Sequence, residues 1–290
     1  MNAPAGERRH PLVELGRFLE IQNLGLNLSF ALAFLVVAAG GLPSARTFVL
    51  IVIAFLAARN AGHAFNRWAD RDLDARNPRT QDRALVTGRT SSRFALAFAG
   101  ANAAIVVVAA ALLNPLALLL VPVALAIVIG YSYTKRVTSL TTVVLGLVEA
   151  ITPAAVYVAV QGQLPVAALA ASGALLLWGT AFETVHSLGD LSADRAAGTY
   201  SLPVRLGARG ASRLVPAFHA GALALFALFG VLAHLSIAYY GAVVGMAALV
   251  VLIDARMMER PTESVRPFRA HYALGALFLL GVILSRFVPV

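Results

Sequence analysis

The chain has 290 residues, of which 59% are apolar and 13% are charged, and it contains no cysteine. Soluble domains carry about 45–50% apolar and about 25% charged residues, so this composition excludes an ordinary soluble enzyme and indicates a membrane protein. The lack of cysteine excludes a disulfide, a thiolate metal site and a cysteine nucleophile. The net charge of +9 is interpreted as an excess of basic residues in loops on one side of a membrane, and no nucleic acid is expected as a partner.

Nine apolar stretches are long enough to cross a bilayer as helices, because a span needs about 20 residues. They lie near residues 18–39, 47–66, 94–113, 115–133, 140–160, 164–188, 214–233, 235–253 and 272–289. Breaks rich in Gly, Pro or polar residues separate several of them. The sequence therefore predicts an all-α polytopic membrane protein, with about nine transmembrane helices around a central cavity in one domain over residues 1–290.

The basic residues are distributed unevenly over the two ends of these spans. Nearly all of the 23 Lys and Arg residues fall on the side that carries the N-terminus. Lys and Arg are enriched in cytoplasmic loops, so we expect the tail 1–16 and the two loops 67–93 and 189–213 to face the cytoplasm. The protein is then expected in the bacterial inner membrane, with its active site on the cytoplasmic side.

Six of the seven aspartates gather in two clusters, each where an even-numbered span ends on that same side. The clusters consist of Asp70, Asp72, Asp74 and Asp82, and of Asp190 and Asp194. Two members of each cluster are four residues apart, and residues at this spacing share one face of a helix. If both helices continue through the clusters, two ladders of oxygen ligands end on one face of the membrane, with Asn66 on the first ladder.

This pattern predicts a magnesium site that binds a diphosphate. A carboxylate near the bilayer centre costs roughly 2.5–3.5 kcal/mol on insertion scales, so a cation is expected between the ladders. Oxygen ligands without cysteine suit Mg²⁺, which proteins bind through one or two carboxylates together with substrate phosphate. The candidate metal ligands are Asn66 and the four expected catalytic residues, Asp70, Asp74, Asp190 and Asp194. Basic groups available to the diphosphate are Arg59, Arg67, Arg71 and Lys135.

Two alternatives for the acidic clusters are weaker. One acidic run alone is as often a solvated patch as a ligand set, but two runs on one face at helical spacing favour a functional site. A calcium-binding EF-hand loop starting at Asp70 is excluded, because its sixth position is Ala75 and its twelfth is Gln81. A shift of 120 residues superposes the first aspartate pair on the second, which predicts two pseudo-repeated halves facing one cavity.

At these residues the sequence resembles the UbiA family of intramembrane prenyltransferases. The family's first motif, NxxxDxxxD, begins at Asn66, and its second, DxxxD, begins at Asp190. The run 74–80 and the segment 131–136 resemble the branch that prenylates 4-hydroxybenzoate or related quinone precursors. The resemblance covers about residues 18–289.

The resemblance implies Mg²⁺-dependent transfer of a polyprenyl group from a polyprenyl diphosphate to an aromatic acceptor, in ubiquinone or menaquinone biosynthesis. It implies that Mg²⁺ on the aspartates stabilises the diphosphate as a leaving group, and that an apolar tunnel in the bilayer holds the prenyl tail. Tyr131, Tyr133 and His186 are expected to face the acceptor or the allylic cation.

The chain departs from the branch pattern at two places. Glu183 and His186 stand where the branch has Asp and Tyr, and Gln22-Asn23 stand where a basic residue or His is more usual. The acceptor therefore stays open, and a family member acting on a haem, chlorophyll, lipid or sugar-phosphate acceptor is the alternative. A membrane cation transporter is the alternative from another class; it predicts carboxylates near the membrane midplane, whereas these lie at helix ends.

Overall fold

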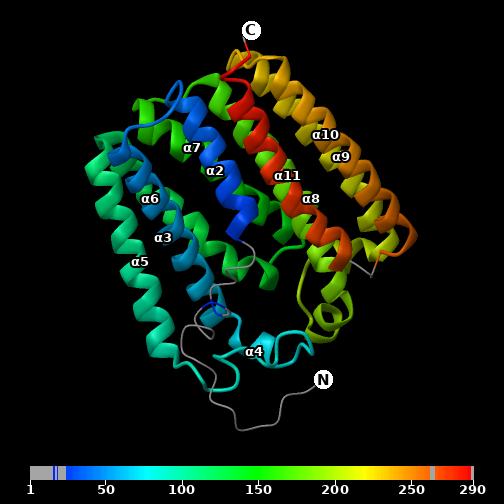
Figure 1. The fold of residues 1–290 in the computed structure, drawn as a ribbon. Helices are drawn as coiled ribbons and strands as arrows, with labels where there is room; N and C mark the ends of the chain where they lie inside the picture. Colours follow the sequence, from blue (N-terminus) through cyan, green and yellow to red (C-terminus); the bar gives the residue numbers. More distant parts are fainter. Residues whose placement is uncertain (1–15, 17, 19–23, 262–264, 289–290) are drawn as a thin grey trace.

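The structure is a computed structural model that describes residues 16, 18, 24–261 and 265–288, with the backbone alone at 265–270 and 272. Within this part of the chain every regular element is a helix (Figure 1). The expected tail 1–16, apart from residue 16, and the Gln22-Asn23 pair lie outside the described residues.

The described chain forms nine long helices, one short helix and a 3₁₀ helix. In order they are α2 (Leu24–Ala38), α3 (Ala45–Ala69), α4 (Arg71–Asp74), α5 (Ser92–Leu113), α6 (Pro115–Gly130), η2 (Tyr131–Arg136), α7 (Thr141–Gln161), α8 (Val166–Ala197), α9 (Leu202–Leu232), α10 (Ile237–Glu259) and α11 (Val265–Leu284). Seven of them, with α6 and η2 taken together, are long and apolar enough to cross a membrane, while α2 and the apolar part of α11 are shorter. The predicted all-α membrane architecture is confirmed, and the predicted count of nine spans is approximate.

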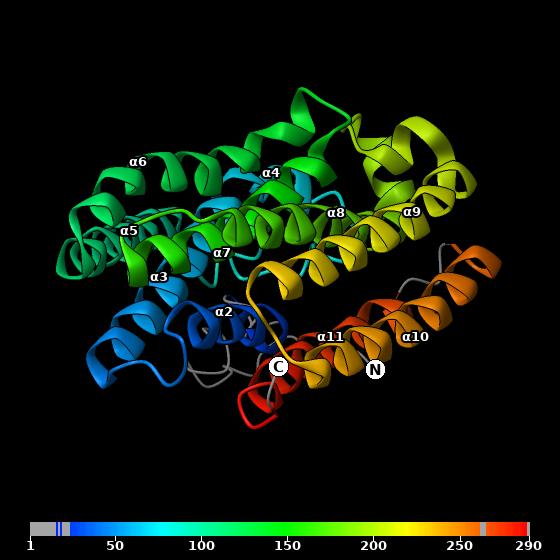
Figure 2. The ribbon, with the colours of Figure 1, turned by 90° about the horizontal axis from the view of Figure 1, so that it is seen from above.

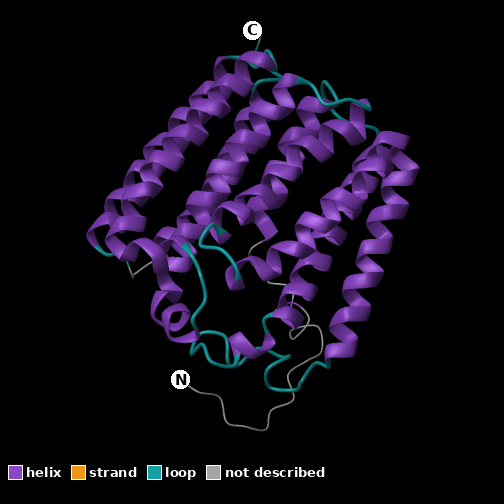
Figure 3. Cartoon of the chain, turned by 180° about the vertical axis from the view of Figure 1, so that it is seen from behind, coloured by secondary structure: helices purple, strands orange, loops and turns teal. Residues whose placement is uncertain are grey.

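The long helices run side by side between two ends of the molecule. Helices α7 and α8 pack against each other, α9 packs on α8, and α10 packs on α11, while α3, α5 and α6 form the other side (Figure 2). A long connection between α4 and α5 lies at the end opposite the C-terminus (Figure 3). We call this end, where α4 also lies, the aspartate end.

A cluster of buried aromatic rings joins helices that are far apart in the sequence. Phe30 of α2 stacks on Phe226 of α9, and Phe226 lies 4.8 Å, centroid to centroid, from Phe278 of α11. Trp178 of α8 packs edge-on against Phe30. These large interlocking rings fix the positions of α2, α8, α9 and α11 in the half of the molecule that carries the second aspartate pair.

The segment 189–213 corrects one expectation, because it is mostly helix rather than loop. Helix α8 runs to Ala197 and stops at Gly198, whose φ of +67° is a conformation that glycine adopts without strain. Helix α9 begins at Leu202, where the side chain of Ser201 accepts a hydrogen bond from the Val204 N–H. Because α8 continues past the second aspartate pair, the pair keeps its helical spacing.

The first aspartate cluster lies at a helix end rather than inside a continuous helix. Helix α3 ends at Ala69, and Asp70 adopts a non-helical conformation between α3 and α4. The Asp70 N–H still donates to the Asn66 carbonyl, and the Asp74 N–H donates to the Asp70 carbonyl, both at 2.8 Å. The i, i+4 spacing of the motif is therefore preserved across the break.

Candidate active site

Both aspartate pairs line one cavity of about 330 Å³ that lies between α3, α7 and α8. All five predicted metal ligands contribute to its wall: Asn66, Asp70, Asp74, Asp190 and Asp194. The loop after the first motif reaches the second motif directly, because Asn77 Nδ2 donates to Asp190 Oδ1 at 3.1 Å. The structure thus brings together two motifs that are about 120 residues apart in the chain.

Asp70 is surrounded by cationic and amide donors and is only 2% exposed. Lys135 Nζ lies 2.6 Å from Asp70 Oδ2, Arg136 Nη2 lies 3.3 Å from Oδ1, and Asn66 Nδ2 donates to Oδ2 at 2.8 Å. Both cations belong to η2, whose Lys135 carbonyl accepts a hydrogen bond of 2.8 Å from the Tyr200 N–H. The turn between α8 and α9 therefore holds Lys135 in place beside the first motif.

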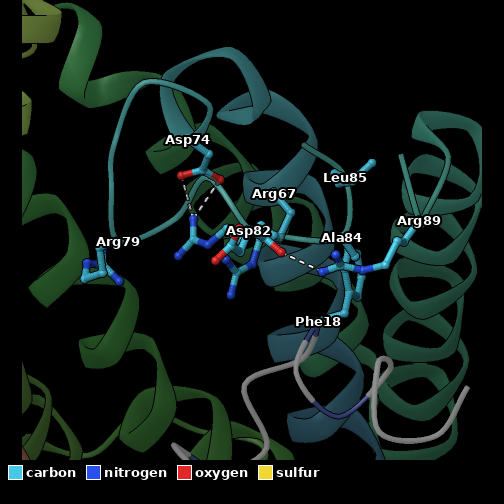
Figure 4. A pocket seen from close by; sticks show the side chains of 9 residues that line it. Phe18, Arg67, Asp74, Arg79, Asp82, Ala84, Leu85 and Arg89 are labelled. Carbon is cyan, nitrogen blue, oxygen red and sulfur yellow. Dashed lines mark hydrogen bonds and ion pairs between the residues drawn. The ribbon is translucent and has the colours of Figure 1, made fainter. Parts of the chain in front are cut away.

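Asp74 is buried against a loop arginine. Arg83 Nη1 lies 2.7 Å from both carboxylate oxygens of Asp74 (Figure 4). Burial raises the pKa of the Asp74 carboxyl to about 6; the charge of Asp70 adds to this rise, while the guanidinium of Arg67 is the strongest opposing influence. The site consequently places a strongly desolvated carboxylate among cations.

The second motif meets the same loop. Arg79 donates two parallel hydrogen bonds to Asp190, from Nε to Oδ1 at 2.7 Å and from Nη2 to Oδ2 at 2.6 Å. Asp194 lines the cavity one turn further along α8 and makes no ion pair with any described side chain. The sequence analysis assigned no site role to Arg79 or Arg83, although Arg79 lies in the run 74–80 that resembles the prenyltransferase branch and Arg83 follows that run.

Most of the other predicted site residues also line the cavity. Arg59, Arg67, Lys135, Tyr131 and His186 all do so. Two predicted residues do not, because they point elsewhere. Arg71 pairs with exposed Asp72 at 3.2 Å, and Tyr133 packs against Phe65 beneath the guanidinium of Arg136.

A smaller cavity of about 190 Å³ adjoins the first (Figure 4). Arg67, Asp74, Arg79 and Arg83 line both cavities. Arg89 adds a further guanidinium, held by its 2.6 Å hydrogen bond to the carbonyl of Asp82. The aspartate end of the cavity is thus strongly basic around its carboxylates, as a binding site for a multiply charged anion requires.

The deeper wall of the cavity contains polar residues that the sequence did not mark as ligands. Glu149 of α7 accepts a hydrogen bond of 2.9 Å from Asn27 of α2. Glu183 of α8 lies 3.5 Å from Nδ1 of His186. Glu149 carries no spacing signal in the sequence, because its neighbours across the cavity come from other helices.

The oxygen donors around this cavity suit Mg²⁺ that is bound together with a diphosphate. In the described part of the chain, no group of three or more His, Asp or Glu residues converges closely enough to hold one ion. Mg²⁺ does not require such a cage, because it usually combines one or two carboxylates with water and substrate phosphate oxygens. The carboxylate and amide oxygens around this cavity supply that kind of ligand.

The chain is similar in sequence and in fold to known proteins. The sequence model of the UbiA prenyltransferase family matches residues 27–278. A protein of Aeromonas salmonicida named 4-hydroxybenzoate octaprenyltransferase is 30% identical over 290 residues, which cover 100% of both chains. The apo structure of a UbiA homologue from Aeropyrum pernix matches with a TM-score of 0.83 and 31% identity, over 92% of this chain and 98% of that one.

A third match concerns the fold alone. A UbiA homologue from Archaeoglobus fulgidus, solved with DMAPP and Mg²⁺, has a TM-score of 0.70 at 21% identity, over 92% of this chain and 99% of that one. The family match spans well over half of the chain, so this protein is a member of the UbiA prenyltransferase family and integral to a membrane.

Proposed function

We propose that the protein transfers a polyprenyl group from a polyprenyl diphosphate to an aromatic acceptor, either 4-hydroxybenzoate or another quinone precursor, in a Mg²⁺-dependent reaction. The observation that carries this proposal is the single cavity into which both aspartate pairs face. The name of the Aeromonas salmonicida relative and the Mg²⁺ and DMAPP bound by the Archaeoglobus fulgidus homologue support the same reaction.

The residues proposed to hold Mg²⁺ are Asn66, Asp70, Asp74, Asp190 and Asp194. When bound there, Mg²⁺ neutralises the diphosphate and stabilises it as a leaving group. Lys135, Arg59 and Arg67 line the same cavity, and we assign them to the diphosphate oxygens that the metal leaves uncovered. Charge-assisted hydrogen bonds from such groups hold an anion more strongly than neutral donors do.

The apolar part of the cavity suits the prenyl chain. Phe55, Val128, Leu145 and Phe182 line it away from the aspartates. An apolar wall excludes water, which would otherwise quench the allylic cation left when the diphosphate departs. The ring of Tyr131 also lines the cavity, and an aromatic face can stabilise a cation electrostatically.

We further propose that the aspartate end faces the cytoplasm of a bacterial inner membrane. Arginines are concentrated at this end, as the cavity linings show, and basic residues mark cytoplasmic loops. The polyprenyl diphosphate would then enter with its tail in the bilayer and its anionic head at the cytoplasmic surface.

A transfer assay with matched aspartate variants tests the reaction. Membranes that contain the protein are incubated with a labelled polyprenyl diphosphate, Mg²⁺ and a panel of aromatic acids. Asp70→Ala and Asp190→Ala are expected to lower product formation by about a hundredfold or more, since each removes charge that stabilises the transition state. Asp72→Ala is the control, because the Asp72 side chain is 81% exposed and, within the described part of the chain, pairs only with Arg71.

The competing functions give different results in the same assay. Product formed only with non-aromatic acceptors would favour another branch of the family. Cation flux through the protein without any prenyl donor would favour a transporter. Removal of Mg²⁺ with a chelator is expected to abolish product, and addition of Mg²⁺ is expected to restore it.

A further inference from the structure

Three titratable side chains meet in the core of the molecule, behind the cavity wall rather than in it. They are His219 of α9, Asp254 of α10 and His271 of α11, which we call the buried triad. Nδ1 of His219 lies 2.9 Å from Oδ1 of Asp254, and Nε2 of His219 lies 3.4 Å from Nε2 of His271. Both imidazoles are 0% exposed, and Asp254 is 7% exposed. The reaction proposed above assigns no role to these three residues.

Hydrogen bonding fixes the orientation of the imidazole rings in the buried triad. An ionised carboxylate only accepts hydrogen bonds, so His219 donates its Nδ1 proton to Asp254. The two Nε2 atoms share one further proton, since a hydrogen bond between them needs one donor and one acceptor. The ring of His219 is held at both nitrogens and cannot turn without breaking both contacts. Asp254 therefore orients His219, and His219 orients His271.

Stability alone does not account for the buried triad. A carboxylate inside a membrane-spanning bundle costs free energy, and a buried ion pair is often no more stabilising than apolar side chains of similar volume. Apolar residues at these positions would extend the aromatic cluster around Phe226, which Trp178 already connects to His219. What the triad adds to an apolar core is a fixed orientation of its rings.

The buried triad packs against one aromatic ring that faces the cavity. His271 lies edge-on against Phe182 of α8, with the ring centroids 5.3 Å apart, and Phe182 lines the larger cavity. Trp178 lies one turn earlier on the same face of α8. Its ring centroid is 5.4 Å from that of His219 and 5.6 Å from that of His271. The two imidazoles thus support the face of α8 that carries Phe182.

The position of Phe182 along α8 relates this ring to the prenyl tail. Phe182 precedes Asp190 by eight residues, so it lies about 12 Å further along the helix from the aspartate end. A tail whose diphosphate is bound at the aspartates must pass this level in order to extend further. Removal of the His271 ring leaves a void behind Phe182, and the surrounding structure relaxes partly into such a void. The wall that faces the tail then loses its shape.

We propose that the buried triad is a positioning device that holds the ring of Phe182 against the prenyl tail, and so favours donors long enough to reach that ring. This inference rests on the proposed prenyl transfer. The triad does not touch the substrate: His271 acts through Phe182, while Asp254 and His219 act through His271. An aromatic ring in a fixed position offers a large apolar surface to the tail.

Equilibrium binding of two non-reactive donor analogues tests this proposal. The probes are geranyl and geranylgeranyl thiodiphosphate with Mg²⁺, and the quantity compared is the ratio of their dissociation constants. In His271→Ala the preference for the longer analogue is expected to fall about fivefold, because its tail loses an aromatic contact. The affinity for inorganic diphosphate with Mg²⁺ is expected to stay within about twofold. An unchanged preference would contradict the inference.

Two further variants control this measurement. Asp254→Asn is expected to lower the preference in the same direction but less, because an amide offers His219 either a donor or an acceptor and no longer fixes the ring. His234→Asn is the matched control, since His234 is exposed in the turn between α9 and α10 and its φ of +50° suits asparagine. An equal fall in His234→Asn would assign the effect to a general loss of packing and overturn the inference.

A double variant separates positioning from a merely structural role. Phe182→Ala is expected to lower the preference for the longer analogue as much as His271→Ala does. Addition of His271→Ala to Phe182→Ala is expected to lower it less than about twofold further, because no ring remains to be positioned. Losses that multiply in the double variant would show that the buried triad does not act through Phe182.

Fluorescence tests the same contact without altering the buried triad. Trp68→Phe leaves Trp178 as the only tryptophan of the chain, and Trp178 contacts both imidazoles. Geranylgeranyl thiodiphosphate is expected to change its emission, because the tail contacts Phe182, whereas inorganic diphosphate with Mg²⁺ is expected to leave it unchanged. If the triad variants fail to fold, this measurement decides the inference, and unchanged emission overturns it. If the unaltered protein binds neither analogue with Mg²⁺, the proposed function fails instead.

Discussion

Two loop arginines, Arg79 and Arg83, bring the two aspartate motifs of this protein into contact. Arg83 holds Asp74 of the first motif, and Arg79 holds Asp190 of the second. The two arginines are four residues apart on the same connection between α4 and α5. This loop therefore couples α3 to α8, and each arginine lies where a diphosphate is proposed to bind.

Replacement of Arg79 tests the importance of its two-point contact. Arg79→Lys keeps the positive charge but loses one of the two parallel hydrogen bonds to Asp190. We expect about a tenfold loss in kcat/KM for the prenyl diphosphate, by analogy with the loss of one charge-assisted bond. Arg76→Lys serves as control, since Arg76 is exposed on the same loop. Equal activity of the two variants would show that charge alone suffices.

Sequence reasoning located the residues whose position in the cavity follows from local spacing. The ladder Asn66, Asp70 and Asp74 needs only the helical repeat to be seen, and its convergence with the second ladder follows from shared topology. Arg83 and Glu149 could not be found in this way, because their partners are brought near by tertiary packing. Arg71 shows the opposite error. It adjoins the first motif in the sequence, but its side chain pairs with the neighbouring Asp72 and does not line the cavity.

At the scale of helices, the contact between α7 and α8 sets the width of the inner cavity. Gly146 packs against the backbone of Leu176 so closely that an added Cβ would collide with the carbonyl oxygen of that residue. Sequence patterns showed two apolar spans but not their separation, because a small residue in an apolar run has no periodic signature. Similarly, α9 begins at Leu202, 12 residues before the predicted span 214–233, and is kinked at Gly207, whose φ of +73° is not helical. The segment before the span is rich in arginine and so gave no hydropathy signal.

Substitution of Gly146 tests this close approach. Gly146→Ala is expected to destabilise the protein by about 1–3 kcal/mol, because the added methyl group meets the backbone of Leu176, which cannot move aside as a flexible side chain could. Thermal unfolding in detergent measures the effect. Gly100→Ala is the matched control, since nothing lies within 4 Å of its added Cβ, and replacement of an exposed helical glycine by alanine stabilises by up to about 1 kcal/mol. Equal unfolding temperatures in the two variants would contradict the packing argument.

At the scale of the whole molecule, hydropathy and charge both determine where the site lies relative to the membrane. The apolar faces of the long helices hold the protein in the bilayer, and the buried aromatic cluster keeps α2, α9 and α11 together. The arginine-rich loops keep the aspartate end at one membrane surface. The sequence therefore predicted the general architecture well, because hydropathy and charge act over whole helices, whereas the cavity wall depends on individual contacts between them.

The natural lack of cysteine allows this orientation to be measured directly. Arg76→Cys places a thiol on the exposed loop at the aspartate end, and Leu42→Cys places one in the 95% exposed turn between α2 and α3 at the opposite end. With a membrane-impermeant maleimide, the Leu42→Cys protein is expected to react in cells whose inner membrane is intact, because in the proposed orientation its thiol faces the periplasm. The Arg76→Cys protein is expected to react only after the inner membrane is permeabilised. Labelling in the reverse order would place the aspartate end outside the cytoplasm, and would contradict the assignment of the basic loops by the distribution of positive charge.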